Sequence, residues 1–245
     1  MGFGNYTEQL IARFDRDRKE MPVQWTISEK LLEKITEDGK MKPFYGATTV
    51  MKLSEQDKAA CKAVRDRLFA EHGNRLVGLE PDSYHLTVHA LSNVYNVAND
   101  NELILRSIRN TEPKVEAEFR TIAHLYSRST IRMRALGVST GGKDIVGIKF
   151  VPVSESDYTI LIDLFERMEK VYPLGEFYVP HVSLAYHQIR HHGPQEVAAL
   201  YDALTRINLD LELTIELEVA SLVYQHHFHM NDFRDVFGIR EFAVS

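Results

Sequence analysis

The feature that most limits how this chain can fold is a unit of strand, helix and strand that occurs twice, near residues 44–91 and 144–187. In each copy a β-branched and aromatic stretch leads into a capping box, SEQD at 54–57 or SESD at 154–157, which predicts the start of a helix. Apolar residues at helical spacing follow, and then a second strand that contains a histidine. This repetition indicates an internal duplication.

The duplication predicts an α+β fold with two lobes related by a pseudo-twofold axis. Each lobe is expected to be mainly antiparallel sheet with helices on its outer face, and a cleft separates the lobes. Residues 1–43 are expected to form a helical N-terminal extension, so the bilobal domain covers residues 44–245. The other predicted elements are a short helix at 99–110, a strand-rich segment at 115–138, a hairpin at 139–144, a helix at 193–207 and one long strand at 211–224.

The same small frame surrounds the histidine of each copy, YHLTV in the first and PHVSL in the second. In a strand, side chains i and i+2 point to the same face, so His85 lies beside Thr87 and His181 lies beside Ser183. Each lobe therefore offers one imidazole and one hydroxyl. Two lobes packed about a twofold axis bring both pairs to a single cleft.

Two imidazoles and two hydroxyls around one void suit phosphoryl chemistry that needs no metal. One histidine takes a proton from the attacking oxygen, the other gives one to the leaving oxygen, and the hydroxyls donate hydrogen bonds to the phosphate oxygens. The pKa of histidine lies near neutrality, which lets one copy stay neutral while the other is charged. We therefore take His85 and His181 as candidate catalytic residues, take Thr87 and Ser183 as candidate substrate ligands, and expect no cofactor and no metal.

The paired frame resembles the motif of the 2H phosphoesterases, in which histidine, an apolar residue, Thr or Ser and another apolar residue occur twice. The resemblance covers roughly residues 44–245. Members of this superfamily include LigT-like 2'-5' RNA ligase-like proteins of bacteria, 2',3'-cyclic nucleotide phosphodiesterases and 2',5'-oligoadenylate phosphodiesterases. The resemblance implies a bilobal fold, an acid/base pair at His85 and His181, and phosphate ligands at Thr87 and Ser183.

The stretch KPFYGATTV ahead of PDSYHLTV is similar to a bacterial and fungal subgroup of the same superfamily. Ser183 stands where Thr is commoner, and no arginine follows either motif as it does in many ligase-like members; Tyr186 stands near that place in the second copy. Tyr45, Tyr126 and Tyr224 offer aromatic faces on which a base can stack, although each also suits the core. Tyr45 and Tyr186 are our further candidates for substrate binding.

The other histidines have less distinctive surroundings. Strict alternation puts His89 on the face of His85 and His187 on the face of His181, so each either lines the cleft or ends its strand in solvent. HHFH at 226–229 and the pair at 191–192 suggest a metal-binding alternative. No carboxylate or cysteine stands beside them at a ligand-like spacing, so we expect no metal site there.

The composition limits which binding partners and which cellular compartment we expect. A net charge of −6 argues against a wide basic surface for long duplex nucleic acid and leaves a short nucleotide substrate open. The single cysteine, Cys61, fits a reducing compartment. No apolar run reaches the roughly 20 residues of a membrane span, and MGFGNYTEQ does not have the pattern of a signal peptide, so we expect a cytoplasmic protein with no membrane partner.

The sequence thus predicts a metal-independent phosphodiesterase that hydrolyses 2',3'-cyclic or 2'-5' bonds of short RNA or of cyclic or linear oligonucleotides. The alternative is a non-catalytic nucleotide- or RNA-binding module of the same fold, and a histidine-rich metallohydrolase is a third possibility. The sequence leaves open which bond is cut, which histidine is the acid, what residues 1–43 do, and the oligomeric state.

Overall fold

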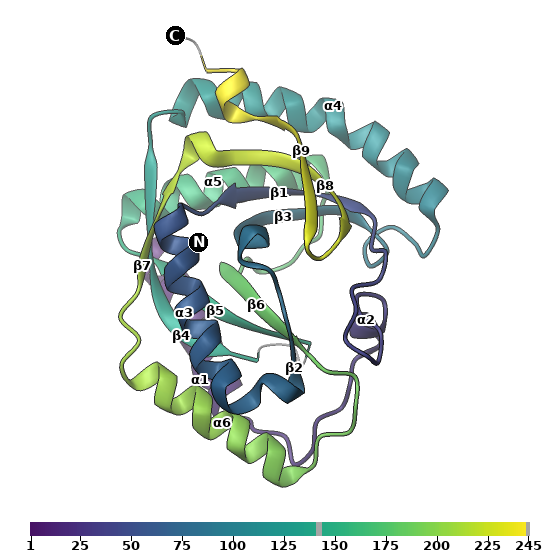
Figure 1. Cartoon of the computed structure of the whole chain (residues 1–245). Coiled ribbons are helices and arrows are strands. Elements are labelled where there is room, and N and C mark those ends of the chain that lie inside the picture. The colour runs from purple at the N-terminus through teal and green to yellow at the C-terminus, as the bar shows by residue number, and fades with distance from the viewer. Residues whose placement is uncertain (141–143, 244–245) are drawn as a thin grey trace.

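Two antiparallel β-sheets face each other in the computed structural model of the chain, which describes residues 1–140 and 144–243 (Figure 1). One sheet has the strand order β3-β1-β8-β9, and the other has the order β2-β6-β5-β4-β7. The strands are β1 (Gly46–Lys52), β2 (Leu76–Gly78), β3 (His85–Asn93), β4 (Thr130–Ser139), β5 (Ile145–Pro152), β6 (His181–His187), β7 (Thr214–Glu218), β8 (Leu222–His229) and β9 (Asp232–Gly238). The helices are α1 (Phe3–Lys19), α2 (Glu29–Leu32), α3 (Glu55–His72), α4 (Asn101–Tyr126), α5 (Glu155–Val171) and α6 (Pro194–Leu209). The predicted α+β class with two lobes is confirmed.

The two copies of the repeated unit are β1-α3-β3 and β5-α5-β6, and both helices begin in the same way. Ser54 Oγ accepts a hydrogen bond from the backbone N–H of Asp57 at 3.1 Å, and Ser154 Oγ accepts one from Asp157 at 3.2 Å. Each hydroxyl in turn donates to the carboxylate of the same aspartate, at 2.8 Å in the first copy and 2.6 Å in the second. Both capping boxes therefore close the first turn of their helix as the sequence predicts.

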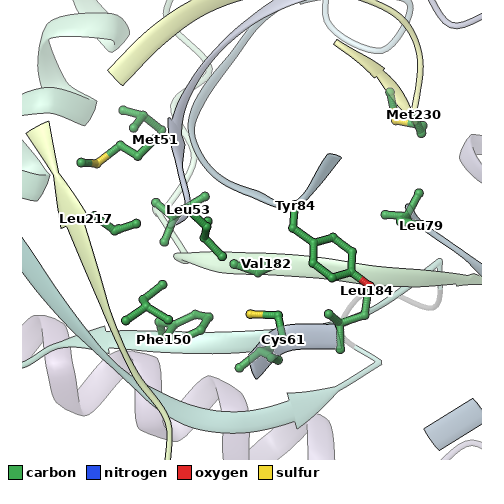
Figure 2. Close-up of a cluster of buried hydrophobic side chains, with 14 of the residues drawn as sticks. Met51, Leu53, Cys61, Leu79, Tyr84, Phe150, Val182, Leu184, Leu217 and Met230 are labelled. Carbon is green, nitrogen blue, oxygen red and sulfur yellow. The ribbon is translucent and has the colours of Figure 1, made fainter. Parts of the chain in front are cut away.

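The helices of the two copies pack across to the opposite sheet. Helix α3 contacts β6 and α6, and α5 contacts β3 as well as β4 and β5. Figure 2 shows the resulting shared core, where Cys61 of α3 lies near Val182 and Leu184 of β6 and Phe150 of β5. Because one apolar core contains residues of both lobes, the lobes form a single body.

The N-terminal residues pack on this body. Helix α1 lies against β4 and β5, where Tyr6 and Leu10 are buried with Val151. The chain then runs past Trp25, whose backbone N–H donates to the His192 carbonyl at 3.0 Å, and continues to α2 between the two sheets' ends (Figure 1). In the extension predicted to be helical over residues 1–43, this second helix is thus only four residues long, and turns follow it.

Two predicted elements are wrong. Residues 115–126 are not strand but the second half of α4, which continues through Pro113. The proline removes one backbone hydrogen bond, yet buried residues at helical spacing, from Ile108 through Val115 to Phe119, hold the helix on the core.

The predicted strand at 211–224 is also divided. It forms β7 in the five-stranded sheet and the start of β8 in the four-stranded sheet, joined by a 3₁₀ turn at Val219–Ser221. Period-two alternation continues through such a crossing, so the pattern alone does not reveal that the chain changes sheet.

Strands β4 and β5 pair on either side of the predicted hairpin, whose centre at 141–143 lies outside the described residues. None of the helices in the described part of the chain combines the length and apolarity that a bilayer crossing requires.

The matched caps give a test of the duplicated unit. Ser54→Ala and Ser154→Ala each remove one N-cap acceptor, so each is expected to lower the free energy of unfolding by about 1 kcal/mol. The measurement is urea unfolding followed by circular dichroism. Thr121→Ala, in the exposed part of α4, is the control and should change stability by less than about 0.5 kcal/mol. A loss in one copy only would contradict the equivalence of the two caps.

Candidate active site

A cavity of about 240 Å³ lies between the two sheets and contains both predicted pairs. His85 and Thr87 reach it from β3, and His181 and Ser183 reach it from β6. The other lining residues are Lys34, Phe44, Thr48, Leu79, Ser83, Ala90, Asn93, Tyr95, Ile145, Tyr186, His227, Met230 and Phe233. Apolar atoms make up most of the cavity surface, and polar side chains converge on it from both lobes, as is common for small-ligand sites.

β-Bulges determine which residues of β3 face the cavity. The register with β1 shifts between Thr49 and Val50 and again between Ala47 and Thr48, so one residue of β3 is passed over at each shift. Each extra residue inverts the alternation of side chains. As a result Ala90 lines the cavity, whereas His89 turns to the opposite face.

Strand β6 has a corresponding bulge. Its register with β5 shifts between Val146 and Gly147, so Tyr186 joins His181 and Ser183 on the cavity face. Gly147 allows this close approach, because a Cβ there would lie 2.7 Å from the Val182 carbonyl oxygen.

The expectation that His89 and His187 either line the cleft or end their strands in solvent is therefore wrong, since both are buried outside the cavity. His89 Nε2 lies 2.9 Å from a carboxylate oxygen of Glu169 on α5. The ring of His187 packs on Trp25, with 4.0 Å between ring centroids.

The two cavity imidazoles are held in the same way. His181 Nδ1 donates to the Val179 carbonyl at 2.9 Å, and the His85 ring donates to the backbone carbonyl of Ser83, again two residues upstream. With Nδ1 protonated, His181 Nε2 carries the lone pair. This ring is therefore oriented to accept a proton at Nε2.

Burial keeps both imidazoles neutral in the protein without substrate. Desolvation lowers the pKa of His85 to about 4, against a weak upward effect of the Ser83 backbone. The pKa of His181 falls to about 3, mainly through burial and further through the positive charges of Lys149 and Lys34 and the His85 ring. Because His85 acts on the pKa of His181, the two rings interact and titrate as a pair.

The two hydroxyls are free to donate. Among residues 1–140 and 144–243, neither the Thr87 nor the Ser183 side chain has a hydrogen-bond partner, although both line the cavity. A hydroxyl with an open donor beside an imidazole is suited to bind a phosphate oxygen.

A third histidine, which the sequence did not single out for this site, also lines the cavity. His227 of β8 is buried, its Nδ1 donates to the Phe44 carbonyl at 2.7 Å, and burial lowers its pKa to about 4. It stands opposite Gly46, where a Cβ would lie 2.6 Å from His227 Nε2. Only glycine at position 46 leaves room for the His227 ring. Gly46, at the start of β1, was therefore the one sequence signal that a side chain packs there.

The tyrosines considered from the sequence differ in whether they reach the cavity. Tyr186 lines the cavity, whereas Tyr45 lies outside it and contacts Phe228, with ring centroids 5.4 Å apart. Tyr224 is fully buried in the core, and Tyr126 ends α4 away from the cavity. Within the described residues, no three His, Cys, Asp or Glu side chains are grouped closely enough to hold a metal ion.

A scan against models of known protein families gives no match, and a search of curated proteins gives none either. Among solved structures, the chain is similar to the conserved protein of unknown function ATU0111 from Agrobacterium tumefaciens strain C58, with a TM-score of 0.67 and 16% identity. The match covers 87% of this chain and 94% of that one. At this identity the likeness shows a shared fold.

Two more distant structures are E. coli LigT complexed with phosphate and a protein described as a phosphoesterase. LigT has a TM-score of 0.42 and 9% identity over 80% of this chain and 97% of its own. The phosphoesterase has a TM-score of 0.42 and 11% identity over 79% and 94%.

The charge state of the site can be tested directly. Because burial lowers both pKa values, the imidazoles of His85 and His181 are expected to be neutral at about pH 6, where an unperturbed ring with a pKa near 6.5 is mostly charged. The measurement is the ¹⁵N chemical shift of the ring nitrogens, assigned with His85→Asn and His181→Asn. Added inorganic phosphate should raise both midpoints, since an anion favours the charged ring. A midpoint near 6.5 for both rings without phosphate would contradict this account.

Proposed function

We propose that this protein is a 2H-type phosphoesterase that hydrolyses 2',3'-cyclic or 2'-5' phosphodiester bonds without a metal. The observation that carries the proposal is the convergence of two imidazoles and two unpartnered hydroxyls in one cavity between the lobes. The resemblance of HLTV and HVSL to the paired superfamily motif supports the same chemistry.

The proposed reaction uses each imidazole once. A water molecule attacks the phosphorus and loses its proton to the Nε2 atom of one histidine. The bond from phosphorus to the 2' or 3' oxygen breaks, and the other histidine, which is charged, gives a proton to that oxygen. The Thr87 and Ser183 hydroxyls donate to the non-bridging oxygens, whose negative charge increases in the transition state.

The surroundings of the two histidines favour His181 as the base and His85 as the acid. The pKa of His181 is lowered by two lysines in addition to burial, whereas that of His85 is lowered by burial alone. A proton shared by the pair therefore resides on His85. The negative charge of the bound phosphate raises the pKa of both rings and favours this singly protonated pair.

The size of the cavity and the net charge of the chain favour a small substrate. A cavity of about 240 Å³ lies below the roughly 300–1,000 Å³ of drug-sized ligand sites, so it accommodates about one nucleotide around the reacting phosphate. The net charge of −6 disfavours a long phosphate backbone. Short RNA ends, cyclic mononucleotides and oligonucleotides fit both limits.

The decisive experiment is a panel of 2',3'-cyclic, 2'-5' and 3'-5' substrates assayed with the wild type and two variants. His85→Ala and His181→Ala each remove one proton-transfer group and should slow turnover roughly 10²–10⁴-fold while the protein stays folded. Thr121→Ala, far from the cavity on α4, is the control and should keep the wild-type rate. Binding without turnover by the wild type across the panel would favour the non-catalytic nucleotide-binding module instead.

The pH profile gives a second test. The pair must hold one proton, and burial keeps its pKa values below the ordinary 6.5, so the reactive form of the free enzyme grows as the pH falls from neutrality. We expect kcat/KM to peak below about pH 6.5 and kcat to peak at a higher pH, because bound phosphate raises the pKa of both rings. Both profiles should be unchanged by EDTA. A rate abolished by EDTA and restored by zinc or manganese would instead indicate metal catalysis.

A further inference from the structure

One side chain of the N-terminal segment, that of Lys34, enters the cavity. Lys34 follows α2, and its ammonium lies over the rings of Phe44, Tyr95 and Tyr186, at 5.6, 5.2 and 5.3 Å from their centroids. These distances lie within the range of cation–π attraction, which offsets part of the cost of removing the charge from water. In the described part of the chain the ammonium has neither an ion pair nor a hydrogen bond.

The position of Lys34 is fixed by its neighbours in the segment. Leu31 and Ile35 on either side are fully buried in the shared core. The Tyr95 hydroxyl donates to the Lys30 carbonyl, and Ser28 caps α2. Lys34 is therefore held at the cavity by packing on both sides of it.

Among the described residues that line the cavity, Lys34 carries the positive charge. No carboxylate is among the lining residues, and the three lining histidines are neutral because burial lowers their pKa values. Burial also lowers the pKa of Lys34 to about 8, against the attraction of Asp144, so the ammonium remains mostly charged at pH 7. Its positive charge acts on the pKa of both His181 and His227, so it lies close to both rings.

We propose that Lys34 binds a phosphate group of the substrate and supplies the positive charge that the two histidine pairs do not. A desolvated ammonium with three N–H donors, an aromatic surround and no ion-pair partner in the described part of the chain binds an anion in preference to a neutral group. The proposal rests on the proposed function for the origin of the phosphate, which belongs to a nucleotide substrate. It assigns to the N-terminal segment a direct contact with substrate.

The test measures equilibrium binding, so it does not depend on turnover. The probes are inorganic phosphate and adenosine 2'-monophosphate, titrated by calorimetry at pH 7. Lys34→Met keeps the length and the apolar stem of the side chain and removes the charge. Loss of one charge-assisted contact should weaken binding of both probes roughly 10- to 100-fold. Lys34→Arg, which keeps the charge, should restore part of the affinity.

Lys30→Met is the matched control. Lys30 lies on the same segment and also over the Tyr95 ring, at 5.5 Å, but it is exposed and does not line the cavity. Removing this charge should change either dissociation constant by less than about 3-fold, because solvent and salt screen it. Equal losses in Lys30→Met and Lys34→Met would show a general charge effect and overturn the proposal.

Binding and turnover together separate this proposal from the proposed function. Wild-type affinity in Lys34→Met, or no phosphate binding by the wild type, overturns the role of Lys34 whatever the activity. In another outcome, Lys34→Met loses phosphate binding and the wild type cleaves no substrate of the panel. That outcome supports the role of Lys34 in phosphate binding and refutes the proposed phosphodiesterase activity.

The phosphate that Lys34 contacts can be identified with two substrates. One is a 2',3'-cyclic mononucleotide, whose only phosphate is the reacting one, and the other is a 2'-5' dinucleotide with a 5'-phosphate. A rise in KM of Lys34→Met for both substrates assigns the contact to the reacting phosphate. A rise only for the 5'-phosphorylated dinucleotide assigns it to the neighbouring phosphate. No rise for either substrate overturns the proposal.

Discussion

The alternation of side chains along β3 and β6, and the bulges that interrupt it, determine what this cavity contains. Without the bulges, strict alternation would bring His89 and His187 to the face that carries His85 and His181. With them, Ala90 and Tyr186 take those places, and the two other histidines turn into the packed interior. Each bulge inserts one residue and so inverts the face of everything beyond it. The chemistry of the cleft thus depends on a few backbone register shifts in its two central strands.

Burial then sets the electrostatics of the cavity. The sheets and the shared core remove water from three imidazoles, so their pKa values fall and the rings stay neutral. The same burial would make an unpaired ammonium costly, and at Lys34 three aromatic rings reduce that cost. Because Lys34 is the charged side chain among the described residues that line the cavity, the site attracts an anion. In the proposed reaction, the negative charge of the entering phosphate raises the pKa of each imidazole and so links substrate binding to proton uptake.

Local patterns predicted the parts of the site that depend on one strand, and missed the parts that depend on tertiary contacts. The pairs His85 with Thr87 and His181 with Ser183 could be read from period-two spacing, which holds over three residues before a bulge intervenes. The strand faces on which His89 and His187 lie could not be predicted, because the residue pattern does not show where a register shift occurs. Helix α4 continued through Pro113 because packing on the core outweighed one lost hydrogen bond. Lys34 and His227 enter the cavity from segments whose positions follow only from the folded core.

The duplication supplies two similar pairs of a histidine and a hydroxyl residue. The residues beside them give the two histidines different pKa values. Each histidine stands opposite a lysine on the adjacent strand, Lys52 for His85 and Lys149 for His181. Lys52 is half-exposed and forms an ion pair with Asp235, so its charge is largely compensated and screened. Lys149 is buried and has no ion pair in the described part of the chain, and its charge lowers the pKa of His181. A difference in proton affinity decides which of two groups holds a shared proton, and a duplicated unit begins with equal affinities. The burial of one lysine and the pairing of the other provide that difference.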